Sequence, residues 1–336
     1  MPLSPDTIQA AIDGKTKPVG SLGRVEDVAK HLAALQDTLS PRAQTCRLFL
    51  FAADHGLANA GVSAYPQDVT RQMVLNMLSG GACANAFAKS VDACVSIVDA
   101  GVAGGPITHT ALIDRRMGPG TENSLVQPAM SAAQVDTALQ HGMDFAREAT
   151  EDVLALGEMG IGNTASASLV IHKITGLDLD SVTGRGTGHT DAGLQRKMDI
   201  LRTAAARTPQ QLDAKTSLAE YGGFEIVMMT GAMLGAAQAR KPVLVDGFIA
   251  SAAALAACHI NSDARKAMIF SHISEEQGHG PLLEEMGAQP LLDLGMRLGE
   301  GTGALLAWPI VKAAAALLRD VASFEGAGVS HRNDAP

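Results

Sequence analysis

Glu300 stands in a setting that suggests chemistry. It lies between Gly299 and Gly301, just before an apolar segment that begins at Gly303. The glycines leave room for a planar ligand beside the carboxylate, and partial desolvation next to Leu298 would raise its pKa toward that of a useful general base. A carboxylate here could instead complement the dipole of the following helix. Spacing alone favours the helix-dipole interpretation.

A glycine-rich segment, GEMGIGNT at residues 157–164, is a second candidate. Glycines before a helix let backbone N–H groups face a site, and a helix N-terminus favours an anion. Asn163 or Thr164 could cap that helix, so a tight turn with an N-cap explains the segment equally well. The spacing fits neither GxGxxG nor a P-loop, which argues against a dinucleotide or ATP site.

The segment GRGTG at residues 184–188 is a third candidate, formed by Gly184, Arg185, Gly186 and the two residues that follow. Such a loop could hold a phosphate, with Lys197 in the next helix as a point charge. A flexible connector with an exposed lysine is the alternative, and composition alone favours it.

Three histidines in polar loops are candidate metal ligands: His55, His272 and His279. They show neither HExxH nor HxH spacing, so a hydrogen-bonding or structural role is the better interpretation. The four cysteines are scattered without a CxxC pair, which predicts neither a metal cluster nor disulfides and indicates a reducing compartment. We therefore expect no metal and no cofactor.

The elements that must position these residues follow from hydropathy. Short apolar runs predict buried strands at residues 47–53, 94–98, 242–245 and 267–270, each followed by a small or polar loop. Helical segments are predicted at residues 69–78, 132–155, 164–174, 194–206, 224–239, 251–258 and 303–318. This alternation predicts an α/β fold with a doubly wound parallel sheet, whose ligands bind beyond the carboxyl ends of the strands. Gly231 and Gly235, four residues apart, indicate close packing of their helix against the sheet or another subunit.

Composition limits the possible partners. The chain has 336 residues, 46% of them hydrophobic, and a formal net charge of −9. No Lys/Arg run occurs, which argues against nucleic acid. The N-terminus lacks the apolar core of a signal peptide, and no apolar stretch approaches the length that spans a bilayer. We expect no membrane association and a cytoplasmic location.

Several segments together resemble one family closely, the nicotinate-nucleotide–dimethylbenzimidazole phosphoribosyltransferases of cobalamin nucleotide-loop assembly. The matching segments, in chain order over about residues 15–329, are KPVGSLGRVE (17–26), AADHG (52–56), YPQDVTRQMVLNML (65–78), VDAGV (98–102), GEMGIGNTA (157–165), GRGTG (184–188), VDGFIASAAALAA (245–257), FSHISEEQGH (270–279) and LLDLGMRLGEGTGALLAWPIV (291–311).

The resemblance implies a Rossmann-like doubly wound parallel sheet with a small helical lobe formed by the N- and C-terminal segments. We expect N-terminal helices of the lobe at residues 1–40, a large α/β domain at 41–300, and a C-terminal helix with a flexible tail at 301–336. It also implies a homodimer without a metal requirement. The implied reaction transfers phosphoribose from nicotinate mononucleotide to 5,6-dimethylbenzimidazole, with inversion.

The resemblance also assigns roles. The family's catalytic carboxylate falls on Glu300. Donor-handling positions fall on Glu158, Gly160, Asn163, Thr164, Gly184, Arg185, Gly186 and Lys197. The acceptor-base pocket is expected at Tyr65, Gln72, Met73 and Leu298.

One departure affects the acceptor. Part of the family has a serine immediately before the proline of the xPxxVT segment and a glutamine eight residues later. This chain has Tyr65 and Met73 there, with Gln72 one place earlier. Another benzimidazole or adenine could therefore be the acceptor. A non-catalytic base- or nucleotide-binding homologue and an NAD-dependent oxidoreductase are rival interpretations. Glu300 speaks against the first, and the missing GxGxxG speaks against the second.

Overall fold

A parallel sheet forms the centre of the protein. The computed structural model describes residues 2–186, 188 and 190–330. Within these residues the sheet has six strands in the order β3-β2-β1-β4-β5-β6, and every pair is parallel. This is the order of a doubly wound Rossmann sheet, in which the chain switches direction between β1 and β4. The predicted α/β fold class is confirmed.

The strands of the main sheet are β1 (Cys46–Ala53), β2 (Cys94–Gly101), β3 (Leu112–Asp114), β4 (Val153–Met159), β5 (Val243–Val245) and β6 (Met268–Phe270), and a two-stranded sheet pairs β7 (His272–Ser274) with β8 (Leu292–Met296). The helices are α1 (Pro5–Asp13), α2 (Arg24–Gln36), α3 (Asp68–Leu78), α4 (Cys83–Ser90), α5 (Ala132–Glu148), α6 (Asn163–Thr175), α7 (Asp191–Ala205), α8 (Ala214–Tyr221), α9 (Phe224–Gln238), α10 (Phe248–Ile260), α11 (His279–Glu285), α12 (Thr302–Arg319) and α13 (Phe324–Ala327), with short 3-10 helices η1 (Gly56–Ala60) and η2 (Ser262–Ala267).

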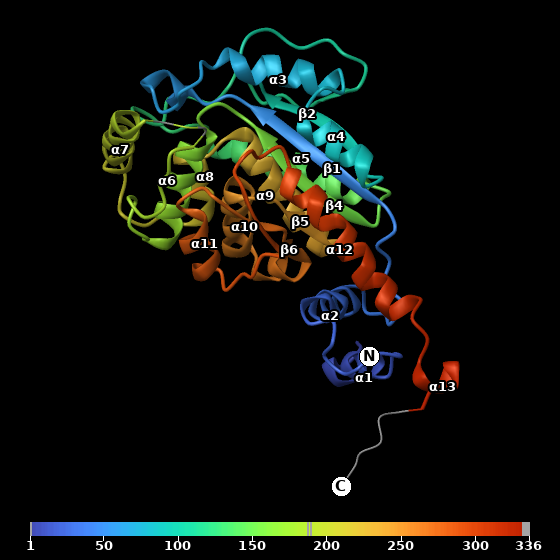
Figure 1. Cartoon of the computed structure of the whole chain (residues 1–336). Coiled ribbons are helices and arrows are strands. Elements are labelled where there is room, and N and C mark those ends of the chain that lie inside the picture. The colour runs from blue at the N-terminus through green and yellow to red at the C-terminus, as the bar shows by residue number, and fades with distance from the viewer. Residues whose placement is uncertain (1, 187, 189, 331–336) are drawn as a thin grey trace.

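Helices cover both faces of the main sheet, as Figure 1 shows. Alternate side chains of β1 supply the two cores, because successive side chains of a strand point to opposite faces. Phe49 and Phe51 pack with α5, α6, α9 and α10. Leu48 and Leu50 pack with α1, α2, α3, α4 and α12. A strand buried on both faces reads as a continuous apolar run, which is why β1 could be predicted.

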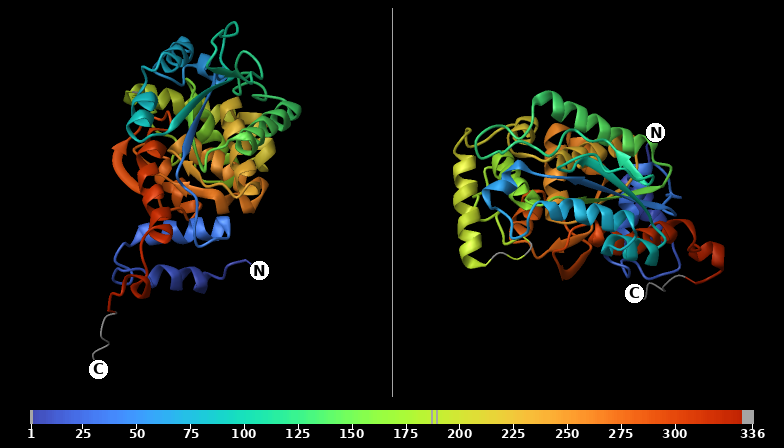
Figure 2. Two further views of the ribbon diagram at one scale, coloured as in Figure 1. Left: turned by 90° about the vertical axis from the view of Figure 1, so that its right-hand side faces the viewer. Right: turned by 90° about the horizontal axis from the view of Figure 1, so that it is seen from above.

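The N-terminal helices α1 and α2 and the C-terminal helix α13 lie at the same end of the molecule (Figures 1 and 2). The Lys15 ammonium donates to the carbonyls of Leu318 and Val321, both at 2.7 Å, where α12 ends. The Phe324 N–H donates to the Gly14 carbonyl. These contacts agree with a helical lobe built from both termini. The domain boundaries stay a prediction, and residues 331–336 of the expected tail lie outside the described residues.

One predicted helix was wrong at its C-terminal end. The expected helix at 132–155 ends at Glu148, and β4 follows as a central strand. The sequence VLALGEM is rich in good helix formers, so local propensity misled the prediction. Its place between β1 and β5 decides the conformation, because apolar side chains there are buried on both faces. The four predicted strands are confirmed as β1, β2, β5 and β6.

A pair of glycines is explained by helix packing. A Cβ at Gly231 would lie 2.1 Å from the Leu139 carbonyl oxygen, and one at Gly235 would lie 2.7 Å from that of Met143. Glycine therefore allows α9 to approach α5 closely. The predicted close packing is confirmed, but the expected partner was wrong, because these glycines face α5 of the same chain and not the sheet or another subunit.

Helix α12 is longer and more apolar than expected, because the sequence predicted no apolar stretch long enough to span a bilayer. Its 18 residues have a mean hydropathy of 1.3, so length and composition alone would suffice to cross a bilayer. In the fold, 61% of this segment is buried, and Trp308 and Leu305 belong to the core beneath the sheet. These contacts are those of a core helix.

Candidate active site

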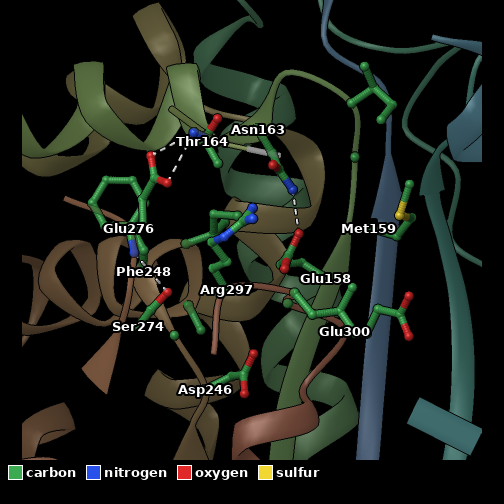
Figure 3. A pocket seen from close by; sticks show the side chains of 18 of the residues that line it. Glu158, Met159, Asn163, Thr164, Asp246, Phe248, Ser274, Glu276, Arg297 and Glu300 are labelled. Carbon is green, nitrogen blue, oxygen red and sulfur yellow. Dashed lines mark hydrogen bonds between the residues drawn. The ribbon is translucent and has the colours of Figure 1, made fainter. Parts of the chain in front are cut away.

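A cavity of about 630 Å³ opens at the carboxyl ends of β4, β5 and β6, where the fold predicts ligand binding. Its lining includes Glu158 and Met159 from the end of β4, Asp246 after β5 and His272 after β6. Figure 3 shows labelled lining residues converging from separate segments.

Glu300 lines this cavity and is 5% exposed. Its backbone has a φ of 59°, in the left-handed region that disfavours residues other than glycine. Its Oε2 accepts a hydrogen bond of 3.2 Å from the Ala84 N–H, in the first turn of α4. Burial raises the pKa of Glu300, and this hydrogen bond partly offsets the effect. Leu298, two residues earlier, is itself 53% exposed.

Asp246 bears on the helix-dipole interpretation of Glu300. The Asp246 carboxylate accepts a hydrogen bond of 2.9 Å from the Ala304 N–H at the start of α12. The N-terminus of α12 therefore already has a carboxylate. Glu300 instead faces the N-terminus of α4, so complementing the dipole of the helix that follows it is not its role. The helix-dipole interpretation was right in kind but placed the carboxylate at the wrong helix.

Close backbone contact brings Glu158 next to the loop of Glu300. A Cβ at Gly157 would lie 2.6 Å from the Gly301 nitrogen, and one at Gly299 would lie 2.3 Å from Glu158 Oε1. Gly157 requires glycine because backbone atoms fill the space beside it, and Gly299 favours glycine because its φ is 87°. Burial raises the pKa of Glu158 to about 8, with further contributions from the nearby carboxylates of Asp246, Glu225 and Glu300. The Asn163 side-chain amide donates to Glu158 Oε2.

Residues 160–164 form the N-terminus of α6 at the cavity wall. The N–H groups of Gly162 and Thr164 have no acceptor in the described part of the chain. A second cavity of about 30 Å³ opens at the same point, lined by Ser63, Gly186 and residues 160–164, among others. Free N–H groups at a helix N-terminus beside a small cavity are suited to binding an anion. Of the two interpretations of this segment, the arrangement favours the anion site.

Lys197 lies behind this wall. Its ammonium is fully buried and donates to the Gly184 carbonyl at 2.9 Å and to Thr164 Oγ1 at 3.2 Å. Burial lowers the pKa of Lys197 to about 8. The exposed lysine of the connector interpretation is therefore wrong, although Lys197 does not line either cavity. Residues 187 and 189 of this region lie outside the described residues.

The other predicted site residues divide into two groups. Gly160, Asn163, Thr164, Gly186, Tyr65, Met73 and Leu298 line the main cavity together with Glu158 and Glu300. Gly184, Arg185 and Gln72 do not line it. Arg185 forms an ion pair with Asp191 on the surface, and Gln72 is exposed on α3.

His272 was considered from the sequence only as a metal ligand, and six other lining residues were not assigned to the site: Met159, Asp246, Phe248, Ser274, Glu276 and Arg297. Asp246 and His272 had a usable signal, because each closely follows a predicted strand. Glu276 and Arg297 had none. They reach the cavity through the small sheet of β7 and β8, which the sequence did not predict.

All three loop histidines are hydrogen-bonded, as predicted. The Ser274 N–H donates to His279 Nδ1 at 2.8 Å, so neutral His279 carries its proton on Nε2, 3.0 Å from Ser251 Oγ. Burial lowers the pKa of His279 to about 3. In His272, Nδ1 faces the Ile273 carbonyl at 3.0 Å.

His55 forms a buried network under the 160–163 turn. Its Nδ1 lies 2.8 Å from Ser166 Oγ and its Nε2 lies 2.7 Å from Glu225 Oε1. Burial disfavours the charged imidazole, but the carboxylates of Glu225 and Asp54 outweigh it and raise the pKa of His55. The network joins the ends of β1, α6 and α9. Among the described residues, no three His, Cys, Asp or Glu side chains come together as a metal site.

A doubly wound sheet, a helix N-terminus suited to an anion and clustered carboxylates are typical of α/β enzymes that bind phosphorylated small molecules. The comparisons narrow this class. A phosphoribosyltransferase family model matches residues 4–329. The nicotinate-nucleotide–dimethylbenzimidazole phosphoribosyltransferase of Aromatoleum aromaticum is 49% identical over 328 residues, which are 97% of this chain and 95% of the relative. That of Dechloromonas aromatica is 50% identical over 331 residues, with the same coverage of both chains.

Solved structures agree. The crystal structure of CobT from Thermus thermophilus superposes with a TM-score of 0.94 at 42% identity, covering 98% of this chain and 99% of that one. The chain therefore belongs to the nicotinate-nucleotide–dimethylbenzimidazole phosphoribosyltransferase family.

Proposed function

We propose that this enzyme transfers phosphoribose from nicotinate mononucleotide to 5,6-dimethylbenzimidazole, giving α-ribazole 5′-phosphate and nicotinate in cobalamin biosynthesis. This proposal rests on the main cavity, which is lined by three features. They are the buried carboxylate of Glu300, the helix N-terminus proposed to bind an anion, and an apolar wall. Family membership over nearly the whole chain supports the same reaction.

The donor phosphate is proposed to bind at the N-terminus of α6. The N–H groups of Gly162 and Thr164 are free there within the described part of the chain, and the small cavity beside them would accept a phosphate group. Lys197 would contribute its charge through Thr164, to which it is hydrogen-bonded. Asn163 orients the Glu158 carboxyl, which would face the ribose.

The acceptor is proposed to lie against the apolar wall of Val69, Met73, Met159 and Leu298, with Tyr65 at its edge. Nicotinate leaves readily because its ring nitrogen is cationic in the nucleotide, so its departure needs no acid. The acceptor benzimidazole must lose its N–H proton. Glu300 would take that proton as the general base.

The rest of the rate follows from positioning. Transfer at an anomeric carbon passes through an oxocarbenium-like state, which nearby carboxylates stabilise. Holding two flat rings on opposite faces of the ribose favours direct displacement. Attack opposite the departing nicotinate then inverts the anomeric configuration.

A protonated Glu158 is consistent with Glu300 acting as the ionised base. With its pKa raised to about 8, the Glu158 carboxyl keeps its proton at neutral pH. Glu300 is then spared a second full negative charge nearby, which favours its ionised form. Two carboxyl groups whose environments separate their pKa values are typical of acid–base sites.

The acceptor preference, the oligomeric state and the location are proposals as well. Tyr65 and Met73 at the apolar wall leave adenine or another benzimidazole as alternative acceptors. We propose a homodimer in the cytoplasm and a reaction that needs no metal, as the family resemblance implies. Activity should persist in excess chelator; loss of activity that magnesium restores would contradict a metal-free reaction.

Product analysis tests the proposal. The protein is incubated with nicotinate mononucleotide and 5,6-dimethylbenzimidazole, and the products are separated and their anomeric configuration is determined by NMR. Nicotinate and the α-anomer of ribazole phosphate are expected. Release of nicotinate without a new nucleotide, or a β-anomer, would contradict the proposed transfer. Parallel assays with adenine decide between the acceptors.

A further inference from the structure

The main cavity has an imbalance of charge that the proposed reaction does not yet explain. Four carboxyl groups line it: Glu158, Asp246, Glu276 and Glu300. Arg297 is the one Lys or Arg among the described lining residues. In Figure 3 its side chain points into the cavity.

Arg297 has no fixed partner within the described residues. No carboxylate oxygen lies within 4 Å of its guanidinium, although four carboxyl groups share the cavity with it, and it makes no side-chain hydrogen bond. Some arginines of this fold pair with nearby carboxylates, as Arg207 does with Glu220 at 2.7 Å, whereas Arg297 is exposed and unpaired within the described residues although carboxyl groups line the same cavity. A guanidinium directed into a cavity without a partner is available to a ligand.

We propose that Arg297 binds the carboxylate of the nicotinate ring of the donor and so selects an acidic pyridine nucleotide over its amide. This inference rests on the proposed function, because it assigns a contact to the donor named there. The phosphate of the donor is a different anion, and it has its own site at the N-terminus of α6.

The two cavities adjoin at the N-terminus of α6, where Gly160, Asn163 and Thr164 line both of them. Arg297 lines only the main cavity, so we assign the ring carboxylate and the phosphate to different parts of the site. A guanidinium binds a carboxylate through two parallel hydrogen bonds, a geometry that a neutral amide cannot match. The cationic ring of the donor is meanwhile complementary to the surrounding carboxyl groups. Arg297 would thus neutralise the one ring substituent that the acidic cavity otherwise repels.

The test compares two donors that differ only in this substituent, nicotinate mononucleotide and nicotinamide mononucleotide. Arg297→Met removes the charge and keeps much of the length of the side chain, and Arg297→Lys keeps the charge without the planar fork. Arg147→Met, on the surface of α5, is the matched control for loss of an arginine. Unfolding temperatures are measured for all variants, and Ki values for free nicotinate and nicotinamide are measured alongside kcat and KM.

The wild-type protein should prefer the acidic donor. In Arg297→Met, kcat/KM for nicotinate mononucleotide should fall by about 10- to 100-fold, whereas that for nicotinamide mononucleotide should change by less than about 3-fold. The Ki for nicotinate should rise to that for nicotinamide. Arg297→Lys should recover part of the preference, and it carries the test if Arg297→Met does not fold.

Several results would overturn the proposal. Equal losses with both donors would place Arg297 at the phosphate or in a structural role. An unchanged preference in the variant, or no preference in the wild-type protein, would remove the carboxylate contact altogether. Failure of the proposed function gives a different result, because the wild-type protein would then form no product from nicotinate mononucleotide and any acceptor.

Discussion

The carboxylate of Glu300 accepts a hydrogen bond from the backbone N–H of Ala84, a residue 216 positions earlier in the chain. The contact places an acid that lies just before α12 at the N-terminus of α4. Partial positive charge at a helix N-terminus stabilises an ionised carboxylate, whereas burial opposes ionisation. The net effect is a pKa above the ordinary value, in a group that can still ionise to act as a base.

Replacing Glu300 by Gln should abolish most turnover while donor binding remains. The amide keeps the shape and can still accept the Ala84 hydrogen bond, but it cannot take the acceptor proton. We expect kcat to fall by about 10²- to 10⁴-fold. Steady-state kinetics and calorimetric titration of nicotinate mononucleotide measure the two quantities. Near-normal turnover would exclude Glu300 as the base.

The pH dependence of the wild-type rate should carry the signature of the same group. A base must be ionised, so kcat should fall as the pH is lowered through the pKa of Glu300, which burial places above 4.5. The residual activity of the Gln variant should lack this acidic limb. A limb that persists unchanged in the variant would assign the titration to another residue.

Glu158 should make the folded state less stable as the pH rises. Its pKa is about 8 in the fold and near 4.5 in the unfolded chain, so between these values the folded state holds a proton that the unfolded state has lost. Stability from this group is complete below pH 4.5 and is lost as the pH rises toward 8.

Glu158→Gln should remove that loss. The variant should unfold a few degrees above the wild-type protein at about pH 8.5 and at nearly the same temperature at about pH 5, measured by differential scanning calorimetry. Glu284→Gln, on an exposed turn of α11, is the matched control and should show no such difference. A pH-independent offset between Glu158→Gln and the wild-type protein would contradict the raised pKa.

Four strands could be predicted from the sequence because a local run of apolar residues identifies each of them. Residues 47–53 are apolar on both faces, and the polar residues after each such run lie at the edge where the cavity forms. The sequence did not predict strand β4, because Leu, Ala and Met favour helix. This segment is a strand because it pairs with its neighbours β1 and β5. Tertiary context decided that segment.

The site residues also fall into two groups: those that a local sequence pattern could predict and those brought together by long-range contacts. Glu158 and Asn163 lie five residues apart in one glycine-rich segment, so their neighbourhood was readable from spacing. Arg297 and Glu276 enter the cavity through the pairing of β7 with β8, a long-range contact that leaves no local pattern. Ala84 as the partner of Glu300 is of the same kind.

The acceptor wall offers a comparison between neighbours on α3. Met73 lines the cavity, whereas Gln72, one residue earlier, is exposed and does not. Met73→Ala should raise the KM for 5,6-dimethylbenzimidazole by about 10-fold through lost apolar contact, with the donor KM unchanged. Gln72→Ala should leave both values within about 2-fold. If Gln72→Ala raised the KM for 5,6-dimethylbenzimidazole as much as Met73→Ala does, Gln72 would belong to the acceptor-base pocket, as expected from the sequence.

Lys197 should act on the donor phosphate through the wall it supports. Its ammonium holds Thr164 and the Gly184 carbonyl, both next to the proposed phosphate site. Lys197→Met should raise the KM for nicotinate mononucleotide by about 10-fold and leave that for the phosphate-free nicotinate riboside unchanged.

The stability of the Lys197→Met variant should not fall at neutral pH. Burial holds the pKa of Lys197 at about 8, below its unfolded value of 10.5, so the folded state is progressively penalised as the pH drops through that range. Lys312→Met, exposed on α12, is the control. Equal effects on both donors would mean that Lys197 only supports the fold.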